Sequence, residues 1–108
     1  MQLATENFGE IVVVHAPQDV GEEQAEHVAA YLTSLDRAKV IVDLDGSEVI
    51  DSQGLEMLLN VQDALRLSGG DLKIVTTNST NRTILEITRL DQQLEVFGTV
   101  IEAVRAFL

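Results

Sequence analysis

The chain has 108 residues, of which 45% are hydrophobic, and this is enough for one domain with one core. Its formal net charge of −11 excludes the basic surface that binding to nucleic acid or to anionic membranes requires. The absence of cysteine excludes disulfides and cysteine-based metal or redox chemistry. The first ten residues do not resemble a secretory signal, and no apolar run is long enough to span a membrane, so we expect a cytoplasmic protein.

The amino-terminal part of the chain alternates apolar runs with one amphipathic segment. Residues 11–14 are β-branched or apolar, which is typical of a strand, and residues 3–6 are predicted to pair with it across a turn at residues 7–9. Residues 22–35 carry alanine, valine and leucine on one face at helical spacing, which predicts an amphipathic helix. Residues 40–44 are almost entirely apolar, which indicates a central strand buried on both faces.

The remaining segments continue the alternation. Residues 53–67 predict a helix that ends at a Ser-Gly-Gly sequence, and residues 72–75 predict a second buried strand. Residues 81–88 predict a short helix and residues 94–97 a short edge strand. A Thr-x-x-Glu capping box begins a last helix at residues 100–107. Strands that alternate with helices indicate an α/β fold with a small, mostly parallel sheet.

The most informative segment is the junction between the strand at 40–44 and the helix that follows it. The sequence Asp-Ser-Gln-Gly-Leu at residues 51–55 places the hydroxyl of Ser52 at the amino end of that helix. Backbone N–H groups and the helix dipole favour negative charge there. Ser52 could therefore act as an N-cap, which is worth about 1 kcal/mol, or it could carry a phosphate.

This motif, placed after a Val-Ile-Val-Asp-Leu strand, resembles the signature of the STAS domain, the fold of anti-sigma-factor antagonists. The likeness continues through residues 70–75 and 84–97, so it covers essentially the whole chain. The resemblance implies that residues 1–108 form a single STAS-like α/β domain. In such a domain, helices pack against a small, mostly parallel sheet.

In the family, the serine after the aspartate is phosphorylated by a partner kinase that is also the anti-sigma factor, and a dedicated phosphatase reverses the modification. The resemblance implies that this chain is a non-catalytic switch without cofactor or metal, a monomer or weak dimer. It would bind an anti-sigma factor or related GHKL-type serine kinase while Ser52 is unphosphorylated. The implied partner-binding residues are Asp19, Asp51, Ser52, Gln53, Gly54 and Glu56.

The sequence departs from the family pattern at three places. Where the family has Gly-x-Leu-Asp before the first helix, this chain has Ala-Pro-Gln-Asp, so only Asp19 matches. Glu56, one helical turn after Ser52, and Arg89, in a turn, stand where glycine is common. Glu56 and the missing Gly-x-Leu-Asp leave a second STAS role open, that of an accessory subunit in a larger assembly such as a phospholipid ABC transporter, whereas Arg89 is expected to affect only the turn.

A third hypothesis is a small phosphatase similar to the haloacid dehalogenases. Asp43 would be its nucleophile, Asp45 its acid and Thr76 its second motif. That chemistry also needs a downstream lysine and an acidic pair for magnesium, whereas Lys73, the only lysine after Asp45, lies inside a predicted strand. The sequence therefore favours a strand-end turn at this position.

Overall fold

A five-stranded sheet with the strand order β1-β2-β3-β4-β5 forms the centre of the molecule, for which a computed structural model describes residues 2–48 and 50–108. β1 runs antiparallel to β2, and the other three strand pairs are parallel. This confirms the predicted α/β fold. The elements in chain order are β1 (Thr5–Phe8), β2 (Ile11–His15), α1 (Glu22–Thr33), β3 (Lys39–Asp43), α2 (Ser52–Leu67), β4 (Asp71–Val75), α3 (Ser79–Ile87), the 3-10 helix η1 (Leu90–Gln92), β5 (Glu95–Phe97) and α4 (Val100–Phe107).

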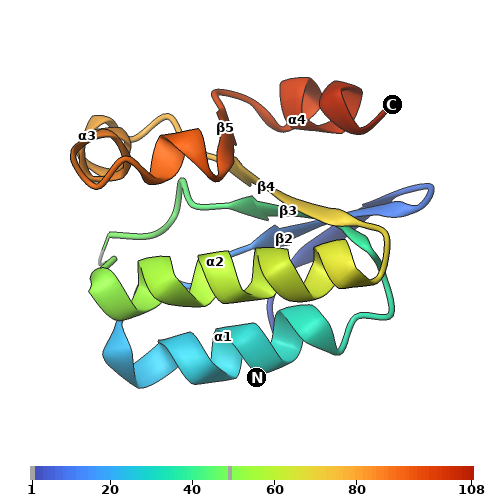
Figure 1. The fold of residues 1–108 in the computed structure, drawn as a ribbon, viewed down its shortest axis with the longest axis horizontal. Helices are drawn as coiled ribbons and strands as arrows, with labels where there is room; N and C mark the ends of the chain where they lie inside the picture. The colour runs from blue at the N-terminus through green and yellow to red at the C-terminus, as the bar shows by residue number, and fades with distance from the viewer. Residues whose placement is uncertain (1, 49) are drawn as a thin grey trace.

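The helices form a layer on each face of the sheet, with α1 and α2 side by side below it and α4 above it in Figure 1. Alternate residues of each strand point to opposite faces, and this divides the core into two clusters. The larger cluster joins α1, α2 and α3 to one face, and the smaller joins α4 to the other. The strand residues of the larger cluster are Val12, Val14, Val40, Val42, Leu72 and Ile74.

β3 is the central strand, and its apolar residues are at most 1% exposed, as its composition predicted. The charged residue Lys73 is buried in the neighbouring strand, on the face that α4 covers. Its ammonium lies 2.9 Å from the Glu95 carboxylate and 4.5 Å from the ring centre of Phe107. The ion pair and the cation–π contact offset the cost of burying this charge and help attach α4 to the sheet.

Two turns differ from the sequence prediction or refine it. The hairpin turn lies at residues 9–10 and not at 7–9, because Phe8 still pairs with Ile11 and Gly9 adopts a left-handed φ of 64°. Arg89, which stands where the family often has glycine, also lies in the left-handed region, with φ 60°. A glycine would adopt this conformation without strain, so the departure at Arg89 affects the turn before η1.

Candidate functional site

The candidate site lies at the carboxyl edge of the sheet, where the parallel strands end and the helices begin. The loops after β2, β3 and β4 lead into the amino ends of α1, α2 and α3 respectively. In parallel α/β sheets this edge carries most ligand and partner sites. It holds Asp19 in the first loop, and Asp51 and Ser52 at the start of α2.

The carboxylate of Asp51 joins the amino ends of two helices. Its Oδ1 accepts hydrogen bonds from the backbone N–H groups of Gln53 and Gly54, both at 3.0 Å, and caps α2. Its Oδ2 accepts a hydrogen bond of 2.9 Å from the N–H of Glu22, at the start of α1. The bonds from Gly54 and then Glu22 are the main reasons why the pKa of Asp51 lies below its ordinary value.

Ser52 is exposed and is the first residue of α2. The interpretation of Ser52 as the N-cap is therefore wrong, because Asp51 performs that role one residue earlier. The Ser52 hydroxyl makes no hydrogen bond to any other residue that the structure describes. The predicted loss of about 1 kcal/mol on removal of this hydroxyl is corrected to a smaller value, because the cap remains.

Gly54 is buried and lets the first turn of α2 approach the backbone of the loop before α1. A Cβ atom at this position would overlap the carbonyl oxygen of Val20. Gly21 has a related role, because a Cβ there would lie 2.9 Å from both Asp19 Oδ1 and Asp51 Oδ2. The structure thus brings Asp19, Asp51 and the start of α2 together, as the resemblance implied, although they are about 30 residues apart.

The loop that precedes α2 is attached to neighbouring loops by polar contacts that the sequence analysis missed. The hydroxyl of Ser47, which is fully buried, donates a 2.7 Å hydrogen bond to the carbonyl oxygen of Pro17. The buried side chain of Asn81, in the first turn of α3, donates to the carbonyl oxygen of Ser47 at 3.3 Å. No local pattern distinguishes these two residues from solvated loop residues, because their partners lie about 30 positions away.

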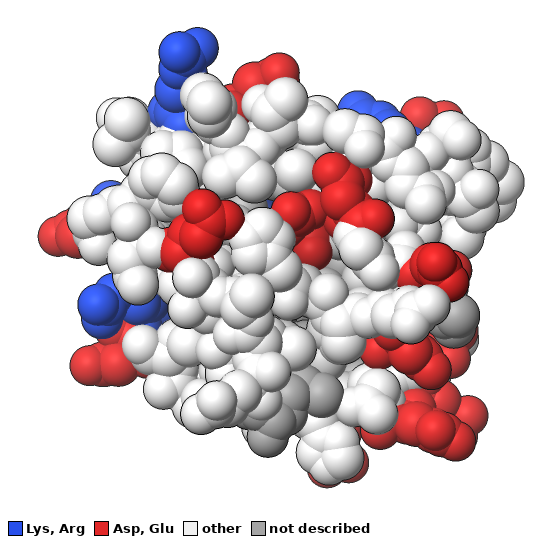
Figure 2. All heavy atoms as spheres, turned by 180° about the vertical axis from the view of Figure 1, so that it is seen from behind, with Lys and Arg blue, Asp and Glu red and all other residues white. Residues whose placement is uncertain are grey.

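Gln53 and Glu56 are exposed on α2 beside Ser52 and line a shallow groove of about 370 Å³ between α1 and α2. Its walls include Glu22 and Glu26, and its floor includes Met57. Residues 1–36 and 40–65 contain no lysine or arginine. Acidic side chains accordingly crowd the lower right of Figure 2, the end that carries the amino ends of α1 and α2.

The two aspartates of the phosphatase hypothesis, Asp43 and Asp45, accept hydrogen bonds from neighbouring side chains and backbone N–H groups. Asp43 accepts hydrogen bonds from His15 and from the N–H of Asp45, both at 2.9 Å. Asp45 in turn accepts from the N–H and the hydroxyl of Thr77. Within the described part of the chain, no three histidine, aspartate or glutamate side chains are arranged to hold a metal ion.

The chain belongs to the STAS domain family, because residues 2–103 match the model of that family. A Thermotoga maritima protein named "Putative anti-sigma factor antagonist" is 31% identical over 65 residues, which cover 60% of this chain and 58% of the relative. The match thus spans less than two thirds of that relative. None of the described helices has the length and apolar character needed to cross a membrane.

Solved structures show the same fold. The crystal structure of an anti-sigma factor antagonist from Thermotoga maritima, also designated "putative", superposes with a TM-score of 0.87 at 22% identity, covering 97% of this chain and 93% of that one. The Bacillus cell fate determinant SpoIIAA in its phosphorylated form superposes with a TM-score of 0.70 at 17% identity, covering 97% of this chain and 98% of that one.

Proposed function

We propose that this chain is an anti-sigma factor antagonist whose binding to its partner is switched by phosphorylation of Ser52. The observation that supports this best is the division of roles between two adjacent residues. Asp51 caps the helix, so the exposed hydroxyl of Ser52 has no structural role among the described contacts. The similarity to the Thermotoga protein and the existence of SpoIIAA in a phosphorylated form support the same interpretation.

In the unphosphorylated state, this chain binds its partner, an anti-sigma factor that is also a GHKL-type serine kinase. It contacts the exposed side chains of Ser52, Gln53 and Glu56. The half-buried Asp19 and Asp51 form the edge of this surface. The buried Gly54 does not contact the partner but sets the position of the helix that carries the surface. The acidic surroundings favour basic contact residues on the partner.

A phosphate on Ser52 would add nearly two negative charges at a helix amino end, which the fold tolerates because the dipole favours them. The loop before α1 and the start of α2 lie within residues 1–36 and 40–65, which contain no lysine or arginine to pair with it. The phosphate would therefore stay exposed and repel or obstruct the partner, and a serine phosphatase would restore binding. In this proposal the nucleotide belongs to the kinase and not to this chain, and the cycle takes place in the cytoplasm.

The chain itself is not a catalyst in this proposal. Asp43, the nucleophile of the phosphatase hypothesis, has its two carboxylate oxygens bonded to His15 and to the Asp45 N–H. Lys73 is paired with Glu95 on the face that α4 covers. We therefore expect no magnesium-dependent turnover of small phosphoesters. Metal-dependent hydrolysis that Asp43→Asn abolishes would contradict this.

Phosphorylation mapping by mass spectrometry, with the cognate kinase and ATP, tests the switch. Ser79 provides a matched control, because it is also an exposed first residue of a helix, after the cap Asn78. We expect stoichiometric phosphate on Ser52 and none on Ser79. Ser52→Ala should stay folded and bind the kinase permanently, whereas Ser52→Asp should bind at least tenfold more weakly, about 1.4 kcal/mol.

Two outcomes would contradict the proposal. The first is phosphate on Ser79 or another residue while Ser52 remains unmodified. The second is equal affinity of Ser52→Asp and Ser79→Asp for the kinase, which would show that negative charge at Ser52 has no specific effect. Stable co-purification with a transporter complex, unaffected by either substitution, would favour the accessory-subunit role.

A further inference from the structure

The side chain of His15, at the end of β2, lies between two carboxylates. Its Nδ1 is 2.9 Å from Asp43 Oδ2, and its Nε2 is 2.7 Å from Glu6 Oε1. A carboxylate can only accept a hydrogen bond, and a neutral imidazole has one N–H to donate. Both bonds therefore form together only when the ring is protonated.

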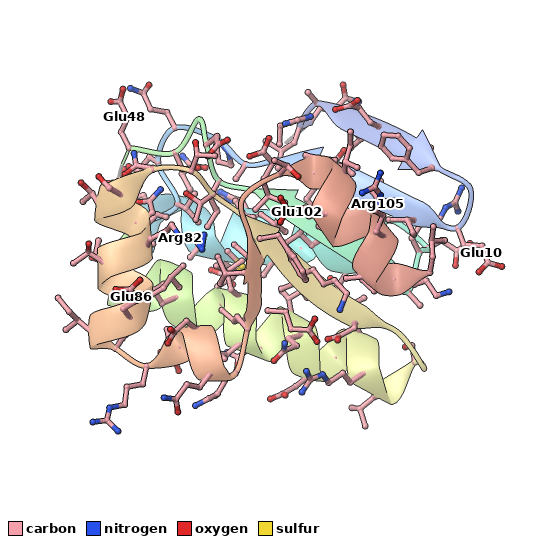
Figure 3. The ribbon with its side chains drawn as sticks, turned by 90° about the horizontal axis from the view of Figure 1, so that it is seen from above. Glu10, Glu48, Arg82, Glu86, Glu102 and Arg105 are labelled. Atoms are coloured by element: carbon pink, nitrogen blue, oxygen red, sulfur yellow. The ribbon has the colours of Figure 1, made fainter. Side chains whose placement is uncertain are left out.

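These contacts connect three adjacent strands, because Glu6 is in β1, His15 in β2 and Asp43 in β3. Asp43 is further fixed by its other oxygen, which accepts a hydrogen bond from the N–H of Asp45. α4 covers the same face of the sheet and carries the charged residues Glu102 and Arg105, labelled in Figure 3. Neither of these pairs with His15 within the described part of the chain.

Apart from its antiparallel pairing with β2 along Thr5–Phe8, β1 has few contacts with the rest of the molecule. It is an edge strand, and all four of its residues, Thr5–Phe8, are exposed. The segment before β1 is better held, because the partly buried Leu3 packs on the core and its carbonyl oxygen accepts a hydrogen bond from the Tyr31 hydroxyl. Within β1 itself, Glu6 makes the one side-chain hydrogen bond that the described residues show to the rest of the sheet.

We propose that Glu6, His15 and Asp43 form a proton-dependent clasp that holds the edge strand β1 against the sheet. The hydrogen bond to Glu6, and then the charge of Asp43, raise the pKa of His15 above its ordinary value of 6.5, against the opposing effect of partial burial. A raised folded pKa means that the stabilisation is complete below the unfolded pKa. It is lost as the pH rises through the folded pKa, above 6.5.

The test uses the full chain and its only other histidine as the control. His27 is exposed on α1. The pKa of each ring is measured by NMR titration between pH 5.5 and 9, in the wild type and in His27→Gln, which assigns the two signals. We expect the His15 pKa to lie above its ordinary value of 6.5 and to fall when Glu6 is replaced by glutamine.

Hydrogen exchange then tests whether the proton holds the strand. After correction for intrinsic exchange, we expect protection of the β1 amides, relative to the β4 amides, to fall roughly two- to fivefold as His15 loses its proton, the range expected for half-exposed ion pairs. His27→Gln should behave as the wild type, whereas His15→Gln should lack this pH dependence. A His15 pKa at or below 6.5, or β1 protection that stays constant through the His15 titration, would overturn the proposal.

Discussion

The amino ends of α2 and α3 share a local design but differ in their surroundings. Each begins with a side-chain cap, Asp51 or Asn78, that accepts two backbone hydrogen bonds, and each continues with an exposed serine. The cap of α2 also binds the first turn of α1, whereas the described bonds of the Asn78 side chain stay within α3. An exposed serine after a cap is thus common to both helices. At Ser52 this arrangement is combined with a capping carboxylate that also binds α1 and with an acidic surrounding surface.

The third residue of each helix, Gly54 in α2 and Asn81 in α3, contacts a distant loop. Substitutions at these two positions should give the largest difference in the free energy of unfolding. Gly54→Ala should destabilise the fold by about 3 kcal/mol, because the new methyl group overlaps the Val20 carbonyl and the helix must move. Asn81→Ala, the counterpart in α3, should cost about 1 to 2 kcal/mol, because it leaves the Ser47 carbonyl without that donor. Urea unfolding measures both.

Gly46→Ala is the matched control for Gly54→Ala, because a Cβ there has no atom within 4 Å. It should change the free energy of unfolding by less than about 0.5 kcal/mol. If Gly54→Ala changed the free energy of unfolding as little as Gly46→Ala, the close approach of α2 to the loop before α1 would not stabilise the fold. The contact between the amino ends of α1 and α2 would then not distinguish Ser52 from Ser79.

The two caps should differ in their dependence on pH. The folded pKa of Asp51 is lowered, so the stability it contributes is complete above its unfolded pKa, near 3.8, and is lost as the pH falls through the folded value. Asn78 does not titrate in this range, and Asn78→Ala should cost about 1 kcal/mol at every pH. We expect Asp51→Asn to lower the free energy of unfolding at pH 7. The difference in this free energy between Asp51→Asn and the wild type should be smaller at pH 3.

Unfolding curves at both pH values for wild type, Asp51→Asn and Asn78→Ala provide the measurement. Other carboxylates also titrate, but they are common to all three proteins and cancel in the differences. A deficit of Asp51→Asn that is the same at pH 3 as at pH 7 would mean that the charge of Asp51 contributes nothing to its role as a cap of two helices.

The sequence predicted the order and type of every strand and α-helix, because the apolar runs and helical periodicities are local properties of the chain. It placed Ser52 at the start of α2 correctly but assigned the cap one residue late, since Asp and Ser are equally good N-caps. Three features escaped prediction because they depend on strand register or loop proximity: the burial of Lys73 against Glu95 and Phe107, the position of His15 between Glu6 and Asp43, and the contact of Ser47 with Asn81.

The smallest effect on folding, but a measurable one on binding, is expected at Glu56. It is exposed on α2 in the acidic groove, one turn after Ser52, and a partner should meet it with a basic residue. Glu56→Gly restores the residue common in the family, and it should weaken the complex with the kinase and reduce the salt dependence of binding, because an exposed interfacial charge acts largely through screened attraction. Glu56→Gln separates the loss of charge from the cost of glycine within a helix, about 1 kcal/mol.

Glu86→Gln is the matched control on α3, since Glu86 is also an exposed helical glutamate, lies away from the groove and is labelled in Figure 3. Affinities of the four proteins for the kinase are measured at low and high salt. We expect both Glu56 variants to bind more weakly at low salt and to converge with wild type at high salt, while Glu86→Gln follows wild type throughout. Equal affinities and equal salt slopes for Glu56→Gln and Glu86→Gln would place the partner surface away from this groove. The acidity of the amino end of α2 would then no longer distinguish this end from the amino end of α3, and phosphorylation of Ser52 would be the remaining difference between them.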